Sequence, residues 1–206
     1  VIISDTHDRH KNLVIPPCDL LISCGDYSFK GESYIVKSFH EWLSEQPAKH
    51  IISVQGNHEK WVEANFQEAK RIVEEINPNI HFIDEGVVEI DGVKIYGSAI
   101  TPYFYNWAWN RYPGFEIKKH WDKIPDDTNI LITHGPPRDI LDTVYFPNGT
   151  PRENVGCQDL SDRIKELKDL KLHCFGHIHG SAGEYYFNGV KYINAAICDE
   201  RYAPTN

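Results

Sequence analysis

Five short segments of this 206-residue chain place carboxylate, imidazole or amide side chains directly after a run of apolar residues. Such groups are common donors to divalent cations, and a mixed nitrogen and oxygen set suits Mn, Fe or Zn better than Mg or Ca. The set is too large for one ion, and a shared carboxylate is the usual way to hold two cations about 3.5–4 Å apart. The candidate residues, in chain order, are Asp5, His7, Asp26, Asn57, His58, His134, His177 and His179.

Each segment also has a simpler interpretation. An Asp-x-His triplet is usually a surface turn, and a Gly-Asp pair is a common turn sequence. Residues 56–59 could be a turn followed by a helix cap with acidic residues in the first turn. The alternate histidines His177 and His179 are uncommon without a ligand role. Because all five segments occur in order and always after an apolar run, their combination favours a functional site.

The strands and helices that must position these side chains are predicted from the order of apolar runs and helical stretches along the chain. Short runs rich in Ile, Val and Leu alternate with longer stretches of helical period, which indicates an α/β fold. Loops at the carboxyl ends of strands are where such folds place their sites. The predicted strands comprise residues 1–4, 19–24, 50–54, 130–133 and 172–175. Three strand ends carry a glycine, where the backbone must turn sharply close to ions or phosphate: Gly25, Gly56 and Gly176.

Helices and hairpins complete the prediction. Apolar spacings of three and four residues predict amphipathic helices over residues 35–43, 62–76 and 160–167. Two tight turns, Asp91-Gly92 and Asn188-Gly189, lie between alternating segments and predict antiparallel hairpins. Helical crossovers combined with hairpins suggest two mixed sheets packed together, with helices outside. No linker or internal repeat interrupts the chain, so we expect residues 1–206 to form a single domain.

Composition narrows the class of function. The chain is 41% hydrophobic and 25% charged, and no apolar run approaches the ~18 residues that a membrane span requires. A net charge of -9 disfavours long nucleic acid and favours a small phosphate ester, because polyanion binding depends on lysine and arginine. Five cysteines without a Cys-x-x-Cys pair indicate reduced thiols and a cytoplasmic protein. The chain begins at Val1 and contains no Met, so we expect the native start to lie upstream.

The polar segments resemble the sequence blocks of the calcineurin-like metallophosphoesterase superfamily, which run Asp-x-His, Gly-Asp, Gly-Asn-His-Asp/Glu, His and Gly-His-x-His. The resemblance extends from residues 4–7 to residues 176–179. Residues 56–59, 101–104, 133–137 and 192–195 further resemble the branch called metallophosphoesterase-domain-containing proteins. The superfamily implies a four-layer α/β/β/α sandwich, which agrees with the two mixed sheets expected above.

The resemblance implies two divalent metal ions, with Mn favoured and Fe, Zn or Ni as alternatives. The ligands would be Asp5, His7 and His179 for the first ion, Asn57, His134 and His177 for the second, and Asp26 between them. Two cations sharing Asp26 would lower the pKa of a bridging water, and the resulting hydroxide would attack phosphorus in line. His58 would remain free of metal and, when protonated, would donate to the departing alkoxide.

The resemblance to this branch favours a phosphodiesterase acting on small diesters such as cyclic nucleotides. A phosphomonoesterase or a protein phosphatase on the same metal core is an alternative, and a metal-poor scaffold is the non-enzyme alternative. The predicted substrate contacts are Arg9, Asn57, His58, Tyr103 and Phe104. Aromatic residues of the 103–112 segment could stack on a nucleobase. An equally weighted alternative is that they pack this loop onto the domain.

Overall fold

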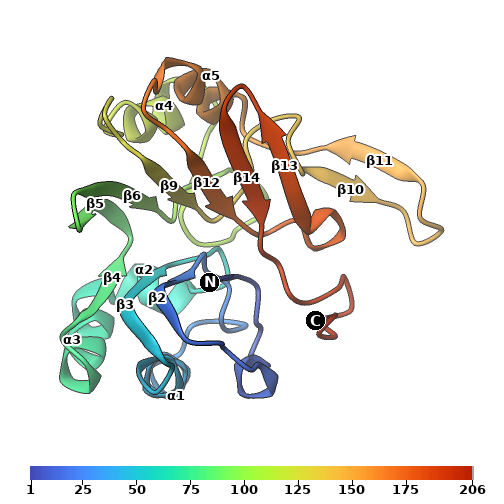
Figure 1. Ribbon diagram of the computed structural model, residues 1–206. Helices are drawn as coiled ribbons and strands as arrows, with labels where there is room; N and C mark the ends of the chain where they lie inside the picture. Colours follow the sequence, from blue (N-terminus) through green and yellow to red (C-terminus); the bar gives the residue numbers. More distant parts are fainter. Residues whose placement is uncertain (206) are drawn as a thin grey trace.

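The computed structural model describes residues 1–205 and contains two large sheets packed face to face, with helices on both outer sides (Figure 1). The first sheet has four strands in the order β1-β2-β3-β4, and all neighbours in it are parallel. We expected this sheet to be mixed, but it contains no hairpin because each of its strands is joined to the next by a crossover. Its strands are β1 (Ile2–Ile3), β2 (Cys18–Ser23), β3 (Ala48–Val54) and β4 (Ile80–Ile83).

The second sheet is mixed, as predicted. Its order is β13-β14-β12-β9-β6-β5, with four parallel central strands and an antiparallel hairpin at each edge. In each predicted turn the first residue, Asp91 or Asn188, has a backbone conformation in the left-handed region and is followed by a glycine. This conformation matches the twist of strands that are joined by a two-residue hairpin. The strands are β5 (Glu85–Ile90), β6 (Val93–Ser98), β9 (Ile130–Thr133), β12 (Leu172–Phe175), β13 (Gly183–Phe187) and β14 (Val190–Asn194).

Five α-helices cover the sheets: α1 (Ser33–Ser44), α2 (Lys60–Ala64), α3 (Phe66–Ile76), α4 (Phe115–Trp121) and α5 (Gln158–Glu166). The single helix predicted over residues 62–76 is therefore wrong, because the backbone at Asn65 leaves the helical region and separates α2 from α3. Helix α4 and strand β4 were not predicted. Shorter elements are η1 (His10–Asn12), η2 (His179–Ser181), and the ribbons β7 (Thr101–Pro102) with β8 (Asn110–Arg111) and β10 (Thr143–Tyr145) with β11 (Pro151–Asn154).

Three apolar clusters hold the layers together. Helices α1 and α3 pack on the outer face of the first sheet, for example through Phe39 and Val73. The inner faces of the two sheets share a cluster that includes Ile52 and Ile132. Helices α4 and α5 pack on the outer face of the second sheet, where Trp121 is almost fully buried. The resulting α/β/β/α order confirms the predicted sandwich (Figure 1).

The two sheets are also joined where their parallel strands end. Ser4, directly after β1, forms a parallel bridge with Ala196, directly beyond β14. The carboxyl ends of both sets of parallel strands therefore meet in one place, which is the geometry that the polar segments require.

Two further features of residues 1–205 bear on the predictions from composition. None of the helices combines the length and the apolar character that crossing a bilayer requires. All five cysteines are free, and four of them are buried, as expected for reduced thiols.

Candidate metal centre

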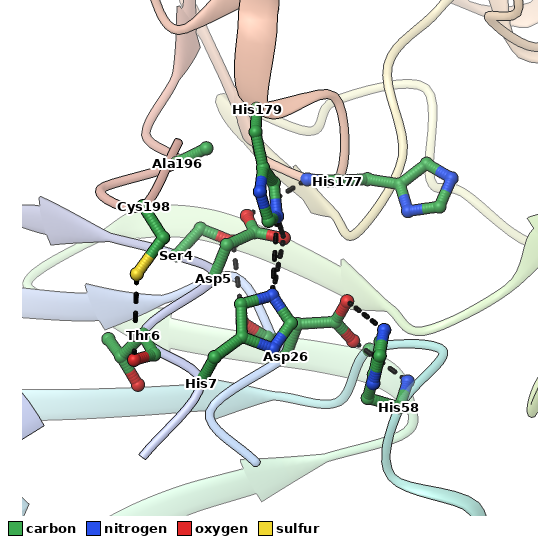
Figure 2. A network of polar contacts seen from close by, with 12 residues as sticks. Ser4, Asp5, Thr6, His7, Asp26, His58, His177, His179, Ala196 and Cys198 are labelled. Atoms are coloured by element: carbon green, nitrogen blue, oxygen red, sulfur yellow. Dashed lines mark hydrogen bonds and ion pairs between the residues drawn. The ribbon is translucent and has the colours of Figure 1, made fainter. Parts of the chain in front are cut away.

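The segments after β1 and β12 bring together the three side chains predicted for the first metal ion. Asp5 Oδ1 lies 3.2 Å from His179 Nε2, and His7 Nε2 lies 3.2 Å from the same nitrogen. Figure 2 shows the rings of His7 and His179 turned toward each other beside the Asp5 carboxylate. Ligand atoms of these three residues all lie within 4.8 Å of one another, so one cation could contact all of them.

A second group forms after β2, β3 and β9. His134 Nε2 lies 3.2 Å from Asp26 Oδ2 and 2.9 Å from Asn57 Oδ1. His177 joins Asp26 and His134 within the same 4.8 Å limit. Asp26 also forms such a group with His7 and His58, so its carboxylate lies between the two clusters. The structure thus brings all seven predicted ligands together, and Asp26 occupies the place expected of a shared carboxylate.

The histidine rings are held so that one nitrogen faces the cluster. In His7, His134 and His179, Nδ1 lies within hydrogen-bond distance of a backbone carbonyl, to which it donates when protonated. This leaves Nε2 as the atom that can accept a metal ion, an arrangement typical of ligand histidines. The pairs are His7 with Ser28 at 3.2 Å, His134 with Cys24 at 2.9 Å and His179 with Asp199 at 2.8 Å.

The electrostatics of the cluster favour bound positive charge. Asp5 and Asp26 are at most 2% exposed, and within residues 1–205 their charged neighbours are histidines rather than lysine or arginine. Burial lowers the pKa of His134, but the charge and hydrogen bond of Asp26, together with the Asp5 charge and the Cys24 carbonyl, outweigh burial and raise that pKa to about 9. A proton on His134 Nε2 lies where a cation bound to Asp26 would lie. These donors therefore fit divalent cations, which would compensate the buried carboxylates.

Backbone conformation at the site is unusual. The φ values of Asp5, Asp26 and His177 are 55°, 53° and 69°, in the left-handed region that residues other than glycine rarely adopt. Such strained positions persist where the surrounding structure holds them, and they concentrate at functional sites. A Cβ atom at Gly56 would overlap Asp26 Oδ1 and lie 2.5 Å from the Asp26 amide nitrogen. The strand-end glycine is therefore required by close packing against the central carboxylate.

Glu59 has a role that we did not predict. Its fully buried carboxylate accepts hydrogen bonds from the amides of Asp26 and Gly56, at 2.9 and 2.7 Å, and from both the amide and the hydroxyl of Ser28. Burial, followed by the charge of Asp26, raises the pKa of Glu59 to about 8, while the bond from Ser28 opposes this rise. Glu59 is the N-cap residue of α2, but its side chain makes no helix-cap bond, so capping does not account for its carboxylate. Glu59 ties the loop after β2 to the loop after β3.

A cavity of about 350 Å³ opens onto this cluster. Its volume lies at the small end of the range for ligand sites, roughly 300–1,000 Å³. His58 lines it, and its Nδ1 lies 3.1 Å from the Phe29 carbonyl. Its Nε2 lies 3.9 Å from Asp26 Oδ2, and Figure 2 shows the ring beside that carboxylate. The other lining residues are Asp26, Asn57, Phe104, Trp107, Val144, His177, Ile178, His179, Gly180, Glu200 and Tyr202.

Comparison with known proteins decides the family. The family model described as calcineurin-like phosphoesterase matches residues 1–181. This chain belongs to the calcineurin-like phosphoesterase family. It is 34% identical to human metallophosphoesterase domain-containing protein 1, over 100% of this chain and 68% of that protein. It is also 31% identical to a UPF0046 protein of Caenorhabditis elegans, over 97% of this chain and 70% of that protein.

A solved structure agrees with this family fold. The protein TT1561 of Thermus thermophilus superimposes with a TM-score of 0.61 at 15% identity, covering 94% of this chain and 86% of that one. The family and its relatives identify this phosphoesterase as a metal-dependent phosphoric ester hydrolase of the metallophosphoesterase-domain-containing branch. A non-catalytic scaffold could lose such residues, whereas all seven predicted ligand positions of this phosphoesterase carry side chains that can bind a metal ion.

The predicted substrate contacts of the phosphoesterase separate into two groups. Asn57, His58 and Phe104 line the cavity. Arg9 is exposed and is not among the lining residues, and Tyr103 stacks on Tyr112 with ring centroids 4.4 Å apart.

The residues of the aromatic segment divide between packing of the loop and lining of the cavity. Trp109 is 6% exposed and packs against Phe66, so it anchors the loop. Phe104 and Trp107 instead face the cavity. Glu200 and Tyr202, near the end of the chain, also line the cavity, and no sequence motif predicted this position.

The phosphoesterase has a larger cavity, of about 630 Å³, between α5 and the β13–β14 hairpin. It contains none of the candidate metal ligands and lies on the outer face of the second sheet. We place the active site at the smaller cavity, because the buried carboxylates, oriented histidines and strained backbone all occur there.

Proposed function

We propose that this protein is a phosphodiesterase that hydrolyses small diesters such as cyclic nucleotides. The observation that supports this most is the lining of the active-site cavity, which within residues 1–205 includes no lysine or arginine. A terminal phosphate carries roughly two negative charges at neutral pH, and such groups are commonly held by arginine. A diester carries one charge and leaves a second ester group that can occupy the apolar part of the cavity.

We propose that Asp5, His7 and His179 hold one divalent cation, that Asn57, His134 and His177 hold a second, and that Asp26 contacts both. The mixed imidazole, carboxylate and amide donors favour Mn, with Fe, Zn or Ni as alternatives. When bound, such ions activate water and neutralise charge on phosphate oxygens. The protein contributes the buried position of these donors and the carbonyl contacts that orient them.

We propose that His58 donates a proton from Nε2 to the departing oxygen. Its Nδ1 is held by the Phe29 carbonyl, so Nε2 is the nitrogen that can face a substrate. Trp107 packs against the ring at a centroid distance of 4.3 Å, with the two planes tilted by 33°, and restricts its orientation. His58 also lies near enough to Asp26 and His7 to be a metal ligand, so its test must include metal content.

The substrate proposal is tested by reconstituting metal-free protein separately with Mn, Fe, Zn and Ni. Rates are then compared on bis(p-nitrophenyl) phosphate, on p-nitrophenyl phosphate, and on 2′,3′- and 3′,5′-cyclic nucleotides. We expect higher kcat/KM on diesters than on monoesters, with Mn giving the highest activity. A preference for the monoester would instead support the phosphomonoesterase alternative.

We further propose a cytoplasmic location, which the five free cysteines support. Fractionation of cells that express the full-length protein would test it. Recovery with a secreted or membrane-bound fraction would contradict the proposal.

A further inference from the structure

The chain returns to the active site after the region that the family model matches. That match ends at residue 181, whereas residues 199–203 form a tight turn beside the metal centre. The Asp199 carboxylate accepts hydrogen bonds from the amides of Arg201 and Ala203, at 2.8 and 2.9 Å. The Asp199 and Ala203 backbones are also bonded to each other. The turn is therefore closed by hydrogen bonds along its whole length.

This turn presents Tyr202 to the cavity. Tyr202 has a φ of 59°, in the left-handed region that residues other than glycine rarely adopt. Its ring meets the ring of His7 edge-on at 4.6 Å and that of Phe29 at 5.2 Å. The Asp199 carbonyl also orients the ring of His179, at 2.8 Å from Nδ1. One turn thus positions both a candidate metal ligand and an aromatic wall of the cavity.

Three aromatic side chains border the metal centre in this way, and together we name Phe104, Trp107 and Tyr202 the aromatic collar. Each packs against a different histidine of the cluster. Phe104 lies 5.1 Å from the ring of His177, Trp107 lies 4.3 Å from that of His58, and Tyr202 contacts that of His7. All three line the same small cavity. A group bound next to the cluster must therefore contact aromatic faces or edges.

We propose that the aromatic collar binds a planar substituent of the phosphate ester, and that Tyr202 is a specificity-determining residue for it. This inference rests on the proposed hydrolysis of small diesters. Aromatic pairs gain free energy beyond that of their buried area, and a tyrosine loses little conformational entropy when it binds. The collar therefore favours esters with an aryl or heteroaromatic substituent over purely aliphatic ones.

A matched pair of ligands that cannot be hydrolysed tests the proposal by binding alone. Phenylphosphonate and methylphosphonate share the anionic head and differ in the planar group. With the metal-loaded protein, isothermal titration calorimetry should show tighter binding of phenylphosphonate. Tyr202→Ala should reduce that preference roughly 2- to 10-fold, leaving methylphosphonate binding unchanged. Tyr202→Phe keeps the ring and should keep the preference.

Two further variants separate this role from a structural one. Asp199→Ala removes the acceptor that closes the turn and should reduce the preference as Tyr202→Ala does. Tyr186→Ala changes a tyrosine that is 70% exposed on β13, and it should have no effect. Equal affinity of the wild-type protein for both phosphonates would overturn the proposal. Equal weakening of both ligands by Tyr202→Ala would overturn it as well.

The phosphonate binding test can be interpreted separately from the proposed hydrolysis. Hydrolysis of bis(p-nitrophenyl) phosphate is measured on the same samples. A wild-type protein that hydrolyses diesters but binds both phosphonates equally counts against the collar alone. A retained preference in a protein that does not hydrolyse diesters counts against the proposed function alone.

Discussion

The histidines of the active site have the same side chain but different surroundings. We propose that these surroundings distinguish the metal ligands from the proton donor. His7, His134 and His179 each direct Nδ1 to a carbonyl and Nε2 to a buried carboxylate or its neighbour. His58 directs Nδ1 to a carbonyl as well, but its ring packs against Trp107 at the edge of the cavity. The residue types and their order could be predicted. The carbonyl partners could not, because they lie 20 to 110 positions away in the chain.

Asp26→Asn should abolish metal binding and activity together. The substitution removes the charge that the neighbouring histidines and the proposed cations share, while the amide keeps the same shape. Metal content by mass spectrometry and diester hydrolysis check the prediction. An active variant with two bound metal ions would exclude a bridging role for Asp26.

His58→Ala should slow esters with poor leaving groups roughly 10²- to 10⁴-fold, the usual contribution of a general acid. Activated aryl esters should be affected much less, because their leaving groups depart without a proton. The variant should keep its metal ions, and this is measured in parallel. Equal losses on both classes of ester, or loss of metal, would argue that His58 is a ligand or a structural residue.

At the scale of elements, the site depends on loops that pass very close to one another after the strands end. The loops after β2 and β3 touch at Gly56 and are tied by Glu59. The five strands that precede the polar segments and both hairpins were predictable, because apolar runs and turn pairs are local signals. The break between α2 and α3 was not, because the apolar spacing continues across Asn65.

Gly56→Ala should lose most metal affinity and destabilise the fold by about 1–3 kcal/mol, since the new methyl group would displace the Asp26 backbone and carboxylate. Urea unfolding and metal titration measure the two effects. The matched control is Gly86→Ala in β5, where a Cβ atom would meet nothing within 4 Å. Similar behaviour of both variants would show that close approach at Gly56 is unimportant.

At the scale of the whole molecule, the two sheets share an apolar cluster, and both supply candidate ligands. We propose that the chain folds as one domain for this reason, because neither sheet alone could assemble the site. Buried histidines away from the metal centre then make its stability depend on pH. His40 in α1 is fully buried, with Nδ1 2.7 Å from the Val36 carbonyl and Nε2 3.0 Å from the Ser53 hydroxyl.

Burial lowers the pKa of His40 to about 4, compared with about 6.5 in the unfolded chain. Between these values the unfolded state binds a proton that the folded state does not. The free energy of unfolding should therefore fall as the pH drops from 6.5 to 4, by about 1.4 kcal/mol per pH unit for this group. The contribution is fully present above pH 6.5.

Urea unfolding of the metal-free protein at pH 7.5, 6 and 5 measures this dependence. His40→Phe replaces the imidazole with a ring of similar size that does not titrate, so its stability should fall less over the same range. Parallel curves for the variant and the wild-type protein would show that His40 does not contribute.

The amino-acid sequence by itself determined the residue types of the metal centre, their order along the chain and the strands that they follow. It could do so because apolar period, turn pairs and polar residues at strand ends are local features. Only the tertiary structure decided which residues line the cavity beside these side chains. Asp5 and His177 are 172 positions apart and yet hydrogen bonded, and Tyr202 reaches His7 through a turn without a motif. Such contacts depend on how the two sheets and the end of the chain pack together, and no local sequence pattern predicts that packing.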